Sequence, residues 1–318
     1  MFKIFSKAAP DPVLDRTFGC AQARSLRKNF EAEKYAALEK QLQSDDDTDQ
    51  RSFYFDVLAE LQDRPPQFDQ WIENRPHSAD ARLASGAQAL DWAWQARGYV
   101  RSEDVSEHDW EQFNARLAFA RAELEAALAL DANDPLAFGY LIRYGLGASW
   151  SLDQATDAYR QATALEPQAW RPAFNYFTFL CQKWFGSHEL MFDFARAVSR
   201  SAPEGADVHA LVAYAHIERW LYTLAFEDNP QADDYWRGDD VFDELIDVYK
   251  LWVNKSYSSP YEKIAANAFL FCFSSLSAKE VMQVELERIG PYPSYTPWRY
   301  LGDPVEVYRE IWNVAFEK

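Results

Sequence analysis

Two segments of similar sequence decide the fold class: ALALDANDPLAFGYL at residues 127–141 and ATALEPQAWRPAFNYF at residues 162–177. The second begins 35 residues after the first, and other positions recur at this offset. A small or apolar residue, a bulky residue and an alanine follow one another at spacings of four and three. The triplet occurs as Ala120, Leu124 and Ala127, as Ala155, Tyr159 and Ala162, and as Leu190, Phe194 and Ala197. These spacings predict helical faces, and the fixed offset indicates a repeat.

A helix-stop signal follows each triplet, at Pro135, at Pro167 and at Pro203 with Gly205. Proline lacks the N–H that would continue the helical hydrogen-bond ladder, and glycine loosens the backbone. A second helical segment comes after each stop. Because small residues let two helices approach closely while a bulky residue fills the groove between them, the pattern predicts stacked helical hairpins.

The pattern Ala-x3-Tyr-x2-Ala-x4-Pro at residues 155, 159, 162 and 167 resembles the second helix of a tetratricopeptide repeat. The neighbouring units keep it less well, since Ala132 and Leu190 replace the Pro and Ala of the pattern. The resemblance implies an all-α, tetratricopeptide-like helical-hairpin array, or α-solenoid, with irregular insertions and a C-terminal capping helix.

A longer resemblance covers roughly residues 20–225. The blocks DWAWQARG (91–98), ALALDANDP (127–135), KWFGSHELMFDFAR (183–196) and APEGADVHALVAYAHIE (202–218), with a variable loop after the first, are similar in that order to a bacterial family of tetratricopeptide-like proteins classed as a domain of unknown function. This resemblance implies a helical fold and no established activity.

Composition limits the partners. The chain has 318 residues, 48% of them hydrophobic, and a formal net charge of −18, which would repel phosphate backbones and anionic lipid surfaces. We therefore expect no nucleic-acid partner. Three scattered cysteines give neither a disulfide framework nor a metal motif and favour a reducing cytoplasm. The absence of a signal-peptide core and of an apolar run of membrane-spanning length predicts no stable membrane insertion.

The predicted organisation is a flexible N-terminus over residues 1–17 and one helical-repeat domain over residues 18–318. The clearest repeats lie in residues 101–205, and C-terminal helices fill residues 241–318. Polar or proline-rich sequence marks irregular segments at 98–109, 226–244 and 290–304. A terminal helix after residue 304 would cover the last open face of the array.

No pattern of reactive residues reaches the level of a catalytic or metal site. HELMF at residues 188–192 has Phe192 where a zincin motif needs its second histidine, so Ser187 is expected to cap a helix that begins at His188. His209 and His216 are about 10.5 Å apart along a helix, too far to share one zinc ion. We predict no catalytic residue, metal or cofactor, which disfavours an enzyme.

Trp92, Trp94 and Arg97 form the first candidate binding site. Because the two tryptophans are two residues apart, they face different sides of one helix. Either an adjacent helix or the following loop buries the second ring, or that ring lines a groove in which Arg97 recognises an anion.

The second candidate is the acidic segment 226–244, with eight acidic residues and one basic residue. Its charge could steer a basic partner and its aromatic rings could hold that partner. The alternatives are a solvated loop or a calcium site, although the spacing of an EF-hand loop is missing. The residues proposed here are Asp233, Asp234, Tyr235, Trp236, Asp239 and Asp240.

The function that the sequence favours is a non-catalytic scaffold that binds a peptide or a partner protein with a basic contact surface. Stacked helix pairs create extended surfaces suited to that role. Two alternatives stay open. One is an enzyme or small-ligand protein with a pocket between the helices and the irregular segments, and the other is an acidic inhibitor or immunity-type partner of a basic protein.

Overall fold

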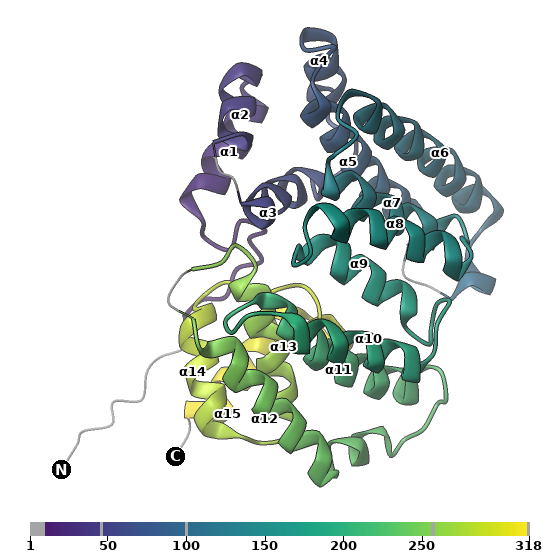
Figure 1. Ribbon diagram of the computed structural model, residues 1–318. Helices are drawn as coiled ribbons and strands as arrows, with labels where there is room; N and C mark the ends of the chain where they lie inside the picture. Colours follow the sequence, from purple (N-terminus) through teal and green to yellow (C-terminus); the bar gives the residue numbers. More distant parts are fainter. Residues whose placement is uncertain (1–9, 45–46, 99–100, 256–257, 317–318) are drawn as a thin grey trace. The chain divides into compact units, whose positions relative to one another are not determined.

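The computed structural model describes residues 10–44, 47–98, 101–255 and 258–316 (Figure 1). This part of the chain contains fifteen α-helices, four short 3₁₀ turns and no strand, which confirms the all-α class. None of its helices is long and apolar enough to cross a membrane. The chain divides into two compact units. The single domain over residues 18–318 stays a prediction.

The first unit, here called the amino-terminal unit, comprises Cys20–Leu180 and Trp184–Gly186. Its helices are α1 (Ala21–Glu31), α2 (Tyr35–Leu42), α3 (Thr48–Ala59), α4 (Gln67–Asn74), α5 (Ala79–Arg97), α6 (Glu107–Leu130), α7 (Pro135–Gly147), α8 (Leu152–Leu165) and α9 (Trp170–Leu180), with a 3₁₀ turn, η1, at Ser102–Asp104.

The second unit, here called the carboxy-terminal unit, comprises Met1–Gly19, Cys181–Lys183 and Ser187–Lys318. Its helices are α10 (His188–Ser201), α11 (Ala210–Ala225), α12 (Asp239–Val253), α13 (Glu262–Ser275), α14 (Lys279–Ile289) and α15 (Pro304–Phe316), with 3₁₀ turns η2 (Asp207–His209), η3 (Ala232–Arg237) and η4 (Trp298–Tyr300).

Short polar residues start several of these helices. Ser78 Oγ accepts a hydrogen bond from the Ala81 amide at 3.2 Å, and Ser187 Oγ accepts one from Leu190 at 3.1 Å, which confirms the predicted cap of α10. Ser151 forms a capping box with Gln154 at the start of α8. At α3 the cap is Asp47, because the Asp47 carboxylate accepts from the amides of residues 49 and 50.

The predicted triplets are buried in two of their three occurrences. Ala120, Leu124 and Ala127 on α6 are buried, as are Ala155 and Ala162 on α8, while Tyr159 is half-buried. On α10, however, Leu190 is 43% exposed, and the buried residues are Met191, Ala195 and Val198, each one position further along. A shift of one residue turns a helix by about 100°, so the 35-residue register ends before α10.

In the amino-terminal unit α5 packs along α6, and α7 packs against both α8 and α9. Gly86 allows the first of these pairs to come close, since a Cβ atom at that position would lie 2.7 Å from Leu124 Cδ2. Helix α3 packs against α5, and each of its residues is buried or half-buried. Its buried residues are Ser52, Phe53, Tyr54, Phe55, Val57, Leu58 and Ala59. Such a helix belongs to the core of the unit.

In the carboxy-terminal unit α13 is buried over most of its length and packs against α11 and α14. Asn267 of α13 also holds the proline-rich segment that follows α14. Its Oδ1 atom accepts hydrogen bonds from Trp298 Nε1 at 2.6 Å and from the Ser294 amide at 3.1 Å. These two bonds hold the segment against α13.

The first and last described segments of the chain pack within the carboxy-terminal unit. Helix α15 buries Tyr308, Trp312 and Ala315. Of the predicted flexible N-terminus, residues 1–9 lie outside the described residues. Farther along, the Val13 amide donates to the Pro291 carbonyl at 2.8 Å.

Candidate binding groove

The amino-terminal unit has an open cleft of about 620 Å³ beside α2 and the α4–α5 turn. A second cleft of about 540 Å³ is continuous with it, because both are lined by Glu39, Gln43 and Arg75. We call the two together the α2–α5 groove. Its remaining lining residues are Ala36, Lys40, Ser44, Arg51, Asn74, Pro76, His77, Ser78, Ala79, Asp80 and Asp131. Most of these side chains are polar, so the groove offers hydrogen-bonding groups rather than an apolar cavity.

Arg51 of α3 forms part of the groove wall between two buried carboxylates. Its guanidinium group donates to Asp80 Oδ1 at 2.7 Å and to Asp134 Oδ2 at 2.7 Å, with two further bonds of 3.2 and 3.0 Å to the same residues. Asp134 also caps α7 through the Leu136 amide, and Asp80 Oδ2 accepts from Gln43 Nε2 at 3.1 Å. One arginine thus fixes the first turns of α5 and α7.

Arg51 supplies one positive charge to the two carboxylates of this cluster. Burial alone would lower the pKa of the Arg51 guanidinium, but hydrogen bonds and negative charges from Asp134 and Asp80 outweigh burial and raise that pKa. The side chains of the two aspartates are only 6% and 2% exposed, so each carboxylate depends on Arg51 for its counter-charge. This cluster is a rigid support and is not free to bind a charged ligand.

Helix α3 also forms hydrogen bonds to α9 and to the middle of α7. The Asp49 carboxylate accepts a hydrogen bond from the Trp170 amide at 2.7 Å, at the first residue of α9. Farther along, Asp56 accepts from Tyr140 Oη at 2.8 Å and pairs with Arg171. Because α3 is buried against the N-terminal ends of three helices, a partner cannot replace it without opening the core. The α2–α5 groove beside it, in contrast, is open.

On the α2 side of the groove, Glu39 contacts Trp71 and Arg75 of the α4 region. Its Oε1 atom accepts from Trp71 Nε1 at 3.0 Å, and Tyr35 stacks on the Trp71 ring at 6.1 Å between ring centres. Arg75, at the C-terminal end of α4, lies 3.7 Å from Glu39 Oε2 through its Nε atom. Arg75 is 44% exposed, so its guanidinium group stays accessible from the groove.

The first predicted site, Trp92 with Trp94 and Arg97, lies where α5 packs on α6. The guanidinium carbon of Arg116 lies 4.0 Å from the centre of the Trp92 ring, and Arg116 donates to the Trp92 carbonyl at 2.7 Å. Trp94 packs edge-on against Phe113, with ring centres 5.1 Å apart.

Both tryptophans of this predicted site are half-buried. Arg97 lies 5.8 Å from the ring centres of both Trp94 and Trp110. Burial lowers the pKa of the Arg97 guanidinium. The neighbouring helix thus packs on the indole rings, which stay half-buried.

The aromatic residues of the acidic segment lie inside the carboxy-terminal unit. Trp236 is 4% exposed and lies near Trp220 and Phe271, with ring centres 6.3 and 6.4 Å away. Tyr235 is half-buried, and its hydroxyl is hydrogen-bonded to His216 Nδ1 at 2.6 Å. Neither ring offers a broad free face to a partner in this conformation.

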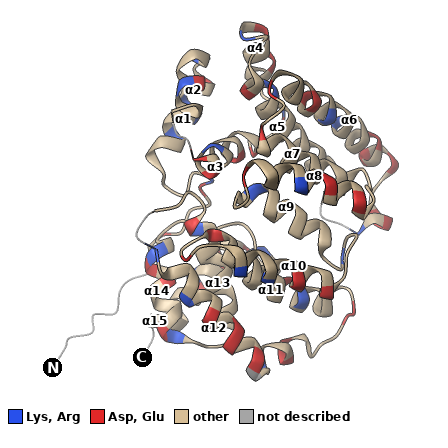
Figure 2. Cartoon of the chain, viewed as in Figure 1, with Lys and Arg blue, Asp and Glu red and all other residues tan. Residues whose placement is uncertain are grey.

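The carboxylates of the same segment lie at the surface. Asp233, Asp234 and Asp240 are exposed, and the side chain of Asp239 lies outside the described part of the chain. Asp233 also accepts a hydrogen bond from Trp220 Nε1 at 2.9 Å, and Asp234 pairs with Arg237. Figure 2 marks further acidic positions along α12.

Next to this segment, His216 joins Tyr235 to a carboxylate. The other ring nitrogen of His216, Nε2, lies 3.1 Å from Glu244 Oε2, and Arg196 donates two hydrogen bonds to Glu244 at 2.6 and 2.8 Å. Burial would raise the pKa of Glu244, but the hydrogen bonds from Arg196 and His216 lower that pKa to about 2.

Since an ionised carboxylate only accepts, His216 Nε2 donates to Glu244. Burial raises the pKa of Tyr235, which disfavours a phenolate nucleophile. The network therefore holds η3 against α11 and α12.

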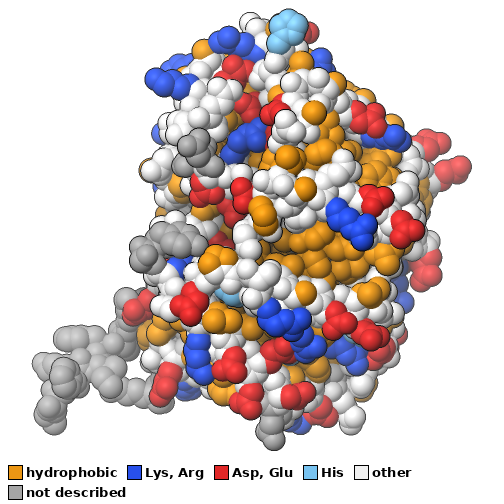
Figure 3. Space-filling view, in the orientation of Figure 1, with side chains coloured by type: hydrophobic (Ala, Val, Ile, Leu, Met, Phe, Trp, Pro, Cys, Tyr) orange, Lys and Arg blue, Asp and Glu red, His pale blue; other side chains and the backbone are white. Residues whose placement is uncertain are grey.

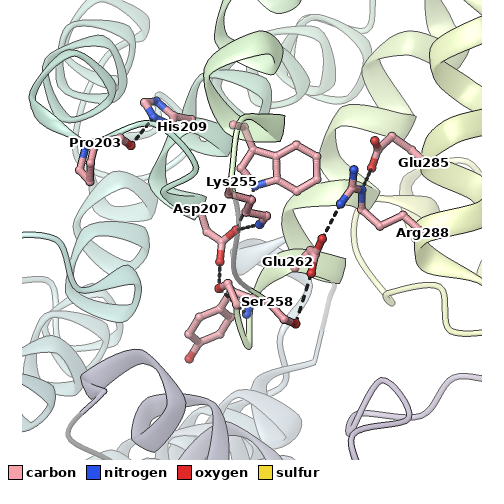
Figure 4. Close-up of polar contacts among 11 residues, drawn as sticks. Pro203, Asp207, His209, Lys255, Ser258, Glu262, Glu285 and Arg288 are labelled. Atoms are coloured by element: carbon pink, nitrogen blue, oxygen red, sulfur yellow. Dashed lines mark hydrogen bonds and ion pairs between the residues drawn. The ribbon is translucent and has the colours of Figure 1, made fainter.

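Other ionisable groups of the carboxy-terminal unit are committed to internal contacts, as Figure 4 shows. Asp207 accepts from Lys255 Nζ at 3.1 Å and from Trp252 Nε1 at 2.9 Å. His209 Nε2 lies 3.0 Å from the Pro203 carbonyl, and burial lowers the pKa of this histidine. Arg288 joins Glu262 to the buried Glu285.

Among the described residues, no group of three or more histidine, cysteine or acidic side chains is arranged to hold a metal ion. Comparison of the chain with protein-family models and with curated proteins gives no match. The site is therefore defined by the geometry of the groove alone.

Proposed function

We propose that this protein is a non-catalytic scaffold that binds a peptide or a segment of a partner protein in the α2–α5 groove. The observation that carries the proposal is the groove itself, an open, polar channel whose walls are held in place by the Arg51 cluster and by Glu39 with Trp71. A preformed channel lowers the entropic cost of ordering the binding surface. Its donors and acceptors match the amide groups of an extended chain.

A scaffold function also agrees with the packing of the amino-terminal unit. We propose that α5–α9 form tetratricopeptide-like hairpins, supported by the packing of α5 on α6, of α7 on α8 and of α7 on α9. In this proposal the inner side of the hairpins is filled by α3, and the peptide binds beside α3 instead of replacing it.

The test begins with selection of peptides from a random dodecapeptide library on the whole protein. Affinities are then measured by fluorescence anisotropy for the parent protein and for Ala36→Trp. Ala36 is an exposed residue of α2 that lines the groove, so an indole ring there would fill the channel without disturbing the core. The matched control is Ala37→Trp, since Ala37 is also exposed on α2 but does not line the groove.

We expect Ala36→Trp to weaken binding about tenfold or more, which corresponds to about 1.4 kcal/mol. Ala37→Trp should keep the parent affinity. If both variants bind every selected peptide like the parent protein, the groove is not the binding surface and the proposed function is wrong.

A further inference from the structure

The two clefts of the groove differ in their accessible charged residues, since Lys40 lines only one and Asp131 only the other, while Arg75 lines both. Acidic and basic side chains are interspersed over the visible surface (Figure 3), but few of those in the groove are free to meet a ligand. Arg51 and Asp80 are paired with each other, and Glu39 is occupied by Trp71. The charged groups that stay accessible are Lys40, Arg75 and Asp131.

The cations lie together. Lys40 is exposed, has no ion-pair partner among the described residues, and lines the part of the groove along α2. Arg75 lines the same part, and the nearest oxygen of its one carboxylate neighbour, Glu39 Oε2, is 3.7 Å from its Nε atom, beyond hydrogen-bonding distance. A carboxylate placed there could therefore bind two cations that the protein itself leaves poorly paired.

The accessible acid lies in the other part. Asp131 is exposed and lines the larger cleft but not the cleft that contains Lys40. Within the protein its Oδ1 atom accepts one hydrogen bond, from the Asn133 amide at 3.0 Å, so its negative charge is not compensated locally. His77 lines the same cleft and adds a polar, exposed ring.

We infer that the groove selects a peptide segment of mixed charge, with an acidic side chain at Lys40 and Arg75 and a basic side chain at Asp131. This inference rests on the proposed function and adds the chemistry of the partner. The positive charges of Lys40 and Arg75 and the negative charge of Asp131 determine the direction of the peptide in the groove, because the reversed direction would bring like charges together. Screening within about 8 Å at physiological salt makes these local charges more important than the net charge of the chain.

The probe is the peptide of highest affinity from the selection, synthesised with acetylated and amidated ends. Two copies are made, one with its acidic residues changed to Gln and one with its basic residues changed to Gln. Each exposed ion pair is worth up to about 1 kcal/mol, or about fivefold in affinity. We expect each neutralised copy to bind the parent protein about three- to tenfold more weakly.

Charge-reversal variants of the protein test which of its residues contacts each charged residue of the peptide. In Lys40→Glu with Arg75→Glu, neutralising the acidic residue of the peptide should no longer weaken binding, and changing that residue to Arg should restore it. In Asp131→Lys, neutralising the basic residue of the peptide should no longer weaken binding, and changing that residue to Glu should restore it. The matched controls, Arg160→Glu and Asp157→Lys, reverse exposed charges on α8 outside the groove and should leave affinity unchanged.

Different results would refute the mixed-charge inference and the proposed function. If Ala36→Trp abolishes binding but the best peptide is uncharged, or charge reversal does not restore affinity, the mixed-charge inference is wrong and the groove remains the binding surface. If Ala36→Trp has no effect, the proposed function itself is wrong.

Discussion

Replacement of Arg51 by alanine tests the structural support of the groove. The change leaves Asp80 and Asp134 without their counter-charge, although their side chains are only 6% and 2% exposed. Removing one partner from a buried ion pair costs about 3–5 kcal/mol, because the remaining charge is left uncompensated. Since Arg51 itself is 20% exposed and water can partly replace it, we expect a loss near the lower limit, about 3 kcal/mol.

The assay is urea unfolding followed by circular dichroism at 222 nm. Arg51→Lys should lose about 1–2 kcal/mol, because an ammonium group keeps the charge but cannot form the forked bonds to both aspartates. The matched control is Arg121→Ala, which removes an exposed pair with Glu125 and should cost less than about 0.5 kcal/mol. A loss in Arg51→Ala no larger than in Arg121→Ala would refute the idea that this cluster supports the unit.

Three further predictions concern other parts of the chain. Ala162→Trp should lower the free energy of unfolding by about 3 kcal/mol or more, because Ala162 is fully buried where α8 packs, and an unchanged thermal midpoint would show that the site tolerates a large ring. Glu244→Gln should cost about 2 kcal/mol at pH 7. Since the pKa of Glu244 is lowered to about 2, the difference from the parent should be full above about pH 5 and disappear as the pH falls toward 2, and a pH-independent difference would contradict this assignment. Changing Asp233, Asp234, Asp239 and Asp240 together to Asn should slow association with a basic partner and flatten its salt dependence, measured by stopped-flow fluorescence, and an unchanged on-rate would show that this surface does not steer the encounter.

The helical class could be predicted from the sequence because its signals are local. The spacings of alanine and bulky residues, the cap at Ser187 and the proline at the start of α7 all lie within one or two turns of the helix they specify. Because these signals are local, they did not predict which face of α10 is buried. The repeat register shifts by one residue at α10, and only tertiary packing shows which face is buried there.

The groove could not be predicted because its residues come together from distant positions. Arg51 meets Asp80 and Asp134, which are 29 and 83 residues away in the chain. The sequence candidates were chosen for aromatic rings or clustered charge, and these features can equally form internal contacts. Trp236 lies in the core, and Arg116 packs on the ring of Trp92. In both places the aromatic residue forms an internal contact, so its presence in the sequence does not by itself indicate a binding site.

The central claim is that a peptide binds in the α2–α5 groove, and hydrogen-exchange mass spectrometry of the whole protein tests it most directly. Exchange is compared with and without a saturating concentration of the best selected peptide. We predict slower exchange in residues 36–44 and 74–80, which contain most of the groove-lining residues, and no change in α8. Protection confined to α5 and α6 around Trp92, or to the acidic segment 226–244, with residues 36–44 unchanged, would contradict the account.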